Sequence, residues 1–319
     1  MILLNMEMIS FVIPCYRSEK TIGIVVEEIE KLMSQHDPFT YEVVLVNDCS
    51  PDNVWDVIRE MGKKDKRIKG ICLAKNFGQH SALMAGYKVC KGDYIVTLDD
   101  DGQTPVEETF KLMDKLFEGY DVVYARYEER KDNLFRKLGT AMNNLMLQIL
   151  SGKPKELHLT SFFVARKFII EEICRYEHSY PYIWGLILRT TRNIANQMIR
   201  HNERKEGKSG YTLIKLLSLW MNGFTAFSVI PLRIVSYMGM FLTVCGFFGI
   251  IFTVVNKLLH PSIQAGYSAL MTVQLIIGGM LMISNGLMGE YIGRIYMGIN
   301  AAPQYVTKEK VNLEEDPDA

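Results

Sequence analysis

The chain has 319 residues, 48% of them hydrophobic, and its 36 Lys and Arg side chains are balanced by 36 Asp and Glu side chains. A net charge of zero argues against a nucleic-acid-binding protein, because phosphate backbones are bound by an excess of clustered positive charge. The six cysteines form no CxxC pair and follow no apolar signal segment. They therefore predict reduced, mostly structural thiols in a cytosolic compartment.

In the first 125 residues, short apolar runs alternate with stretches of helical periodicity. The apolar runs predict strands at 9–13, 41–46, 68–73, 94–98 and 121–124. The periodic stretches predict helices at 21–33, 54–61, 80–90 and 105–117. Strands that alternate with helices predict an α/β fold built on a doubly wound, mainly parallel sheet. A ligand of such a sheet binds beyond the carboxyl ends of its strands.

An aspartate triplet, Asp99-Asp100-Asp101, follows the predicted strand at 94–98 and is itself followed by Gly102 and Gln103. Adjacent carboxylates repel one another and raise one another's pKa unless a cation is present. Oxygen ligands suit Mg²⁺ or Mn²⁺, so the triplet predicts a divalent-cation site completed by diphosphate oxygens. The alternative is a solvated acidic turn. Neither GxGxxG nor GxxxxGK[ST] occurs, so a diphosphate would have to be held by the metal and by side chains.

Two basic groups follow in the sequence and predict anion binding, with ordinary surface charge as the alternative. The first consists of Arg126, Arg130, Lys131, Arg136 and Lys137. The second consists of Arg204, Lys205 and Lys208, with Gly207, Ser209 and Tyr211 among them. The stretch 211–228 carries five large apolar side chains on one helical face, which predicts a helix in a membrane interface or else an ordinary core-facing helix.

Two long apolar runs follow. Residues 232–255 carry only Arg233 as a charge, at the edge of the run, and residues 268–289 carry none. At about 1.5 Å per residue each run can cross a hydrocarbon core roughly 30 Å thick. They predict a transmembrane hairpin, with a pair of buried core helices as the alternative. Arg233 and Arg294 flank the hairpin and favour cytoplasmic ends. The polar, acidic tail 308–319 is expected to be frayed.

Six stretches resemble family 2 glycosyltransferases of the dolichol-phosphate-mannose-synthase type: SFVIPCYRSEKTI (10–22), VNDCSPD (46–52), AKNFGQHSALMAGY (74–87), DYIVTLDDDGQTPVE (93–107), FRKLG (135–139) and ERKEGKSGY (203–211). The ending GLMGEYIGRIY (286–296) looks like the bacterial branch that loads undecaprenyl phosphate. The resemblance runs through about residue 306. It implies a GT-A fold, a UDP-sugar donor, Mg²⁺ or Mn²⁺, inversion at the anomeric carbon and a polyisoprenyl phosphate acceptor for cell-envelope chemistry.

The resemblance also implies roles for residues. The metal ligands would be Asp99 and Asp101, with Gln103 nearby. The nucleotide-sugar would be bound by Pro14, Tyr16, Glu19, Asp48, Lys75, Asp99 and Asp100. The acceptor phosphate would be bound by Arg126, Arg130, Arg136, Arg204, Ser209 and Tyr211. Catalysis would rest on Asp101, Arg126 and Arg136. Relatives are often oligomeric, so a tetramer is the expectation by resemblance.

The implied organisation places the enzyme in the bacterial inner membrane with its catalytic domain in the cytoplasm. The expected parts are a GT-A domain at 1–210, a juxtamembrane helix at 211–231, a transmembrane hairpin at 232–290 and a cytoplasmic tail at 291–319.

One departure from the family concerns the acidic GDF or GDY segment that many relatives carry. The corresponding stretch 156–166 reads ELHLTSFFVAR, with Leu157 or Thr160 in place of the aspartate. Either the sugar differs, Glu156 substitutes, or the activity is altered. A catalytically inactive membrane scaffold and a transferase with another acceptor therefore stay open. A processive polysaccharide synthase is disfavoured because no QxxRW motif occurs.

Overall fold

The structure is a computed structural model that describes residues 7–127, 154, 156–179, 181–199, 230–259, 266–299 and 303–313. The chain divides into two units, one formed by Met1–Thr212 with Ala301–Ala319 and the other by Leu213–Asn300. Within the first unit the described elements are β1 (Met8–Cys15), α1 (Ile22–Met33), β2 (Thr40–Asn47), α2 (Val54–Lys64), β3 (Ile68–Leu73), α3 (Gln79–Tyr87), β4 (Tyr94–Thr97), the 3₁₀ helix η1 (Val106–Glu108), α4 (Thr109–Phe117), β5 (Val122–Tyr127), β6 (Phe163–Arg166), α6 (Lys167–Cys174), α7 (Ile183–Thr190), β7 (Ile194–Ile199) and β8 (Thr307–Val311).

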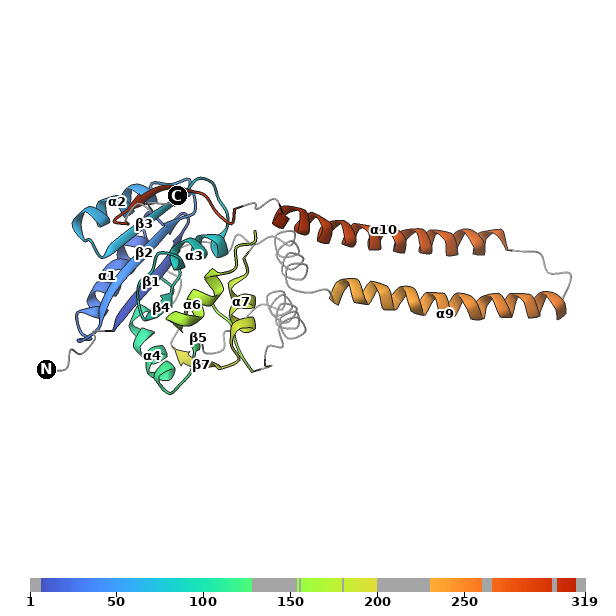
Figure 1. The fold of residues 1–319 in the computed structure, drawn as a ribbon, viewed down its shortest axis with the longest axis horizontal. Helices are drawn as coiled ribbons and strands as arrows, with labels where there is room; N and C mark the ends of the chain where they lie inside the picture. Colours follow the sequence, from blue (N-terminus) through green and yellow to red (C-terminus); the bar gives the residue numbers. More distant parts are fainter. Residues whose placement is uncertain are drawn as a thin grey trace. The chain divides into compact units, whose positions relative to one another are not determined.

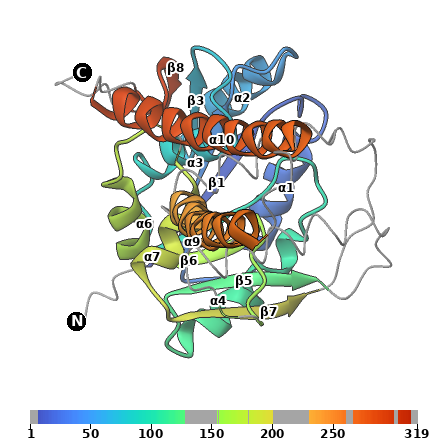
Figure 2. The ribbon, with the colours of Figure 1, turned by 90° about the vertical axis from the view of Figure 1, so that its right-hand side faces the viewer.

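The strands of the described residues form one eight-stranded sheet in the order β7-β5-β6-β4-β1-β2-β3-β8. Figure 1 labels β1 to β5 and β7 of this sheet. The central strands β4, β1, β2 and β3 are parallel to one another, with Phe11 opposite both Val43 and Val96. β6 runs antiparallel between β4 and β5, and β8 runs antiparallel beside β3. β5 and β7 lie side by side as a parallel pair (Figure 2). The prediction of an α/β fold is confirmed. The sheet, which was expected to be mainly parallel, is mixed and contains both parallel and antiparallel pairs.

Helices cover both faces of this sheet, as nearly continuous apolar strands require. On one face the odd-numbered side chains of β1, such as Phe11 and Ile13, form a core with buried residues of α1, α2 and α4. On the other face α3 contacts β1, β2 and β3, and α6 contacts both α3 and β4. The approach of α3 depends on Gly86, because a Cβ there would come within 2.5 Å of a Val12 methyl group.

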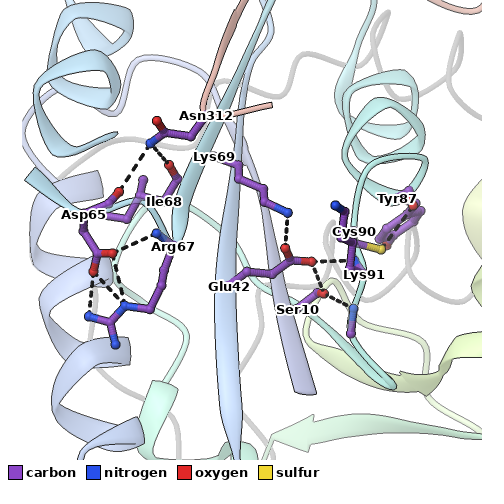
Figure 3. A network of polar contacts seen from close by, with 11 residues as sticks. Ser10, Glu42, Asp65, Arg67, Ile68, Lys69, Tyr87, Cys90, Lys91 and Asn312 are labelled. Atoms are coloured by element: carbon purple, nitrogen blue, oxygen red, sulfur yellow. Dashed lines mark hydrogen bonds and ion pairs between the residues drawn. The ribbon is translucent and has the colours of Figure 1, made fainter. Parts of the chain in front are cut away.

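Figure 3 shows a buried ionic group between β2 and the turn that precedes β4. The Glu42 side chain is 1% exposed and pairs with the Lys69 ammonium. Glu42 also accepts hydrogen bonds from the Ser10 hydroxyl (2.6 Å) and from the backbone N–H of Lys91. The Ser10 hydroxyl oxygen in turn accepts from Gly92 N–H at 2.8 Å. Every polar atom of the group thus has a hydrogen-bond or ion-pair partner, which reduces the free-energy cost of burying the Glu42 charge.

The segment after the hairpin returns to the sheet as β8 (Thr307–Val311), so the expectation of a frayed tail at 308–319 is wrong for residues 308–311. Ala74 N–H donates to Val306 O at 2.8 Å, and Trp55 Nε1–H donates to Glu309 at 2.8 Å. Asn312, with a positive φ of 54°, donates from its side-chain amide to Gly62 O (2.6 Å) and to Ile68 O (2.8 Å). Figure 3 shows the bond to Ile68. The charge and polarity of the tail suggested fraying, whereas backbone pairing with the edge strand β3 orders residues 307–311 as β8.

The second unit contains α9 (Ile230–Leu259) and α10 (Tyr267–Ile299), which contact each other and run in opposite directions (Figure 1). The two apolar runs of the sequence lie within these helices. Their exposed side chains include Phe241, Phe247, Phe252, Leu281 and Met282. Among the residues that the structure describes, no helix combines the length and the apolarity needed to cross a membrane. Residues 211–229 of the interfacial helix expected at 211–231 lie outside the described residues.

Candidate active site

The carboxyl ends of β1, β2 and β4 meet at one edge of the sheet, since these strands are parallel neighbours. A cleft of about 300 Å³ opens there. Its lining consists of Pro14, Cys15, Tyr16, Asp48, Asn76, Gly78, Gln79, Asp99, Asp100 and Asp101. The structure thus brings together Pro14, Tyr16, Asp48 and the whole aspartate triplet, as expected from strand ends. Among the residues that the structure describes, four carboxylates and no cationic side chain line this cleft.

Asp48 follows β2 and holds the loop that leaves β3. Its two carboxylate oxygens accept the backbone N–H groups of Phe77 (2.7 Å) and Gly78 (2.8 Å). Its carbonyl accepts from the Asn76 side chain at 3.2 Å. Gly78 has a φ of +89°, a conformation that glycine adopts without strain. Burial raises the pKa of Asp48, and the two N–H bonds partly offset that rise. Each oxygen keeps one further lone-pair direction for a ligand.

The loop after β1 is tied to its neighbours through backbone groups. Tyr16 N–H donates to Asp100 Oδ2 at 2.8 Å, and the Thr21 hydroxyl donates to Asp100 O at 2.6 Å. Burial raises the pKa of Asp100, and hydrogen bonds to its oxygens oppose that rise. The Tyr16 ring is 44% exposed at the cleft, where it could stack on a base. Asp100 therefore shapes the loop that presents Tyr16.

Two residues assigned to nucleotide binding make other contacts. The Glu19 carboxylate accepts Asn53 N–H at 3.2 Å, at the start of α2, and Glu19 is not among the cleft-lining residues. The Lys75 ammonium lies 4.9 Å from the centre of the Phe77 ring, and Lys75 is also outside the lining. Their role toward a nucleotide stays a prediction.

Asp99 is the most perturbed member of the triplet. Its Oδ1 accepts from Gln79 Nε2 at 3.2 Å, and its Oδ2 accepts from the Ser161 hydroxyl. Burial raises the pKa of Asp99 from 3.8 to about 6, helped by the charges of Asp101 and Asp100 and opposed by the hydrogen bonds from Ser161 and Gln79. A carboxylate whose ionised form is disfavoured in this way gains stability when a cation binds beside it.

Asp101 is exposed at the cleft, and Gln103 contacts it twice. Gln103 N–H donates to Asp101 Oδ1 at 3.0 Å, and the Gln103 side-chain amide donates to Oδ2. Within the described part of the chain, no group of three or more carboxylate, imidazole or thiolate side chains forms a ready metal site. The acidic lining nevertheless fits a divalent cation, provided that ligand oxygens complete its shell.

The residues expected to bind the acceptor phosphate lie mostly outside the described residues. These are Arg130, Arg136, Arg204, Ser209 and Tyr211. Arg126 is described: it lies half-buried in β5, opposite Met198 of β7, and does not line the cleft. Its role stays a prediction.

The stretch that lacks the family's aspartate borders the acidic cleft. Leu157 is buried, Glu156 is exposed, and the Thr160 hydroxyl donates to Ala125 O at 2.9 Å. The next residue, Ser161, donates to Asp99. Sequence reasoning missed both Ser161 and Gln79, because a hydroxyl and an amide carry little signal until their partner is known.

Comparison with known proteins shows which family the chain belongs to. The family model described as "Glycosyl transferase family 2" matches residues 10–174, more than half of the chain. The chain belongs to glycosyl transferase family 2. The model described as "GtrB C-terminal hairpin" matches residues 230–295 of this glycosyltransferase. The resemblance found in the sequence is confirmed, and with it the enzyme class.

The family 2 glycosyltransferase is similar along its length to curated relatives. It is 34% identical over 313 residues to the undecaprenyl-phosphate 4-deoxy-4-formamido-L-arabinose transferase of Yersinia enterocolitica, which covers 96% of this chain and 94% of that relative. It is 34% identical over 318 residues to the enzyme of the same name from Proteus mirabilis, with 97% of each chain covered. Both of these relatives are named as sugar transferases that act on undecaprenyl phosphate.

A solved structure supports the GT-A fold. Glucosyl-3-phosphoglycerate synthase from Mycobacterium tuberculosis, in complex with Mn²⁺, UDP-glucose and phosphoglyceric acid, matches this glycosyltransferase with a TM-score of 0.51. The identity is 17%, and the match covers 69% of this chain and 78% of the other. At this identity the likeness shows a shared fold, and that fold is the GT-A-like one expected.

The raised pKa of Asp99 predicts a pH dependence of metal–nucleotide binding. Below about pH 6 the metal-free site holds a proton that Mn²⁺ must displace. We expect the affinity for Mn²⁺ with UDP to be steady above pH 7 and to weaken by about tenfold per pH unit below the pKa of Asp99. Isothermal titration calorimetry between pH 5 and 8 measures this. An Asp99→Asn variant, which has no proton to lose, should show a flatter profile, and an identical slope in both proteins would contradict the assignment.

Proposed function

We propose that this enzyme transfers a sugar from a UDP-sugar to undecaprenyl phosphate, or a closely similar polyisoprenyl phosphate, with inversion at the anomeric carbon. The proposal rests above all on the end-to-end similarity to relatives named as undecaprenyl-phosphate sugar transferases. The acidic cleft at the ends of β1, β2 and β4 is consistent with it, because a donor diphosphate and its cation fit such a lining. The relatives' sugar, 4-deoxy-4-formamido-L-arabinose, is the first donor sugar to test.

The chemistry needs few protein groups. An acceptor phosphate is ionised near neutral pH, so its oxygen can attack the anomeric carbon without a strong general base. The bond between that carbon and the donor diphosphate breaks, and UDP leaves. Asp99 and Asp101 would hold a divalent cation, which would supply neutralising charge for the leaving diphosphate. Arg126 and Arg136 are proposed to orient the acceptor phosphate, and Tyr16 and Asp48 the nucleotide.

The second unit is proposed to hold the enzyme in the membrane. Exposed apolar side chains on α9 and α10 and the match to a C-terminal hairpin family support this placement. We propose that the hairpin 232–290 spans the inner membrane, that residues 211–231 lie in its interface, and that the catalytic domain faces the cytoplasm. Small residues such as Gly289 and Gly293 would permit close helix packing in an oligomer.

The test is a transfer assay on the full chain in vesicles that contain undecaprenyl phosphate. A panel of UDP-sugars is added with Mn²⁺ or Mg²⁺, and the lipid is analysed by mass spectrometry. We expect one lipid-linked sugar, formed only with metal and lost on chelation, and protein that sediments with the vesicles. Mn²⁺-dependent UDP binding without transfer or donor hydrolysis, from any donor or acceptor, would instead favour the inactive scaffold.

A further inference from the structure

Asp99 differs from its two neighbours in how its carboxylate is held. Asp100 is bonded by the backbone N–H of Tyr16, and Asp101 by Gln103, two residues away. Among the described contacts, Asp99 is the one of the three whose carboxylate is held by side chains from two distant segments. Gln79, twenty residues earlier, donates to Oδ1, and Ser161, 62 residues later, donates to Oδ2.

The position of Ser161 follows from strand pairing. β6 runs antiparallel to β4 with Thr97 opposite Phe163. Continued by two residues past the end of β4, the same register sets Asp99 opposite Ser161. The preceding residue is fixed as well: Trp184 Nε1–H of α7 donates to Thr160 O at 3.2 Å. The Ser161 hydroxyl is therefore presented to Asp99 by the sheet itself.

The position of Gln79 is fixed from the opposite side. Gln79 begins α3, directly after Gly78, whose N–H is bonded to Asp48. The next residue, His80, packs its ring 5.4 Å from the Trp184 ring, edge to face. Trp184 thus contacts both segments that hold Asp99, namely the start of α3 and the segment that carries Ser161. Both donors to Asp99 are backed by packed side chains.

We propose that Ser161 and Gln79 are positioning residues that fix the orientation of the Asp99 carboxylate for the metal–nucleotide complex. The inference rests on the proposed function and deepens its donor site. Both donors are neutral, so they fix the carboxylate without cancelling its charge, as an Arg or Lys partner would. Without them Asp99 must lose side-chain freedom when the ligand binds, which weakens binding.

The experiment measures the dissociation constant of UDP with Mn²⁺ by calorimetry, using the full chain in detergent. Loss of one orienting partner around a metal ligand typically weakens metal affinity by about 10- to 100-fold. We expect Ser161→Ala to weaken binding about tenfold and Ser161→Ala with Gln79→Ala about 100-fold, by the same principle. The matched control is Ser34→Ala, whose exposed hydroxyl donates only to Lys31 O nearby and should not matter.

A double-mutant cycle separates positioning from general structural damage. If Ser161 acts through Asp99, Ser161→Ala should add little in an Asp99→Ala background. The inference would be overturned if the losses of affinity were additive. It would also be overturned if the folded Ser161→Ala variant and the variant with Ser161→Ala and Gln79→Ala bound UDP normally. Either result would leave the transferase function intact. Coupled losses in a protein that binds UDP but transfers no sugar would support the inference and overturn the proposed function.

Discussion

Replacing Asp101 by Asn should reduce sugar transfer by about 10³-fold, equivalent to about 4 kcal/mol of transition-state stabilisation. Asp101 is the exposed carboxylate of the triplet and lies at the cleft. Asn keeps its size and one oxygen but removes the negative charge that Asp101 is proposed to contribute to a divalent-cation site. Initial rates of lipid-linked sugar formation at saturating donor, with Mn²⁺ titrated, measure the loss.

The matched control is Asp56→Asn, the same chemical change at an exposed position of α2 where Asp56 contacts Arg59 at 3.5 Å. It should transfer sugar at the wild-type rate. An Asp101→Asn enzyme that kept its rate and its response to Mn²⁺ would remove Asp101 from the metal site and direct attention to Asp99 or Asp100 as the ligand.

Lys69→Ala should destabilise the first unit by about 3–5 kcal/mol, the usual cost of leaving a buried charge without its partner. Lys69 is 13% exposed and Glu42 is 1% exposed, so water cannot replace the ammonium. Glu42 would keep only the hydrogen bonds from Ser10 and Lys91. Urea unfolding, followed by tryptophan fluorescence, gives the change in midpoint and in free energy.

Lys63→Ala is the control for this prediction, because it removes the same side chain from an exposed pair with Glu60. Such pairs contribute little to stability, so its midpoint should stay close to the wild-type value. If Lys69→Ala were equally harmless, water would have to reach the Glu42 carboxylate, and the account of this buried group would be wrong.

The sequence predicted the central part of the fold because its signals there are local. Apolar runs such as 9–13 and 94–98 end in polar residues, and parallel strands bring those ends together, so Asp48 and the triplet could be assigned to one edge. The antiparallel placement of β6 and β8 could not be predicted in this way. It depends on pairing between distant segments, which a strand's own sequence barely specifies.

The same limit applies within the site. Asp99 was found because three adjacent carboxylates are rare and chemically informative, whereas Ser161 reaches it only through the register of β4 and β6. Glu19 matched a family position, yet its carboxylate faces the start of α2. Resemblance assigns a role to a position, and only the three-dimensional neighbours of the side chain show which atoms are left to perform it.

The place of β8 in the chain has a consequence for biosynthesis. Its residues are translated after α9 and α10, although they complete the sheet that begins with β1. While the ribosome makes the hairpin, the outer edge of β3 has no partner, and unpaired edges invite association with other chains. The nascent enzyme must therefore hold its first unit unfinished until the hairpin has been made and β8 can pair with β3.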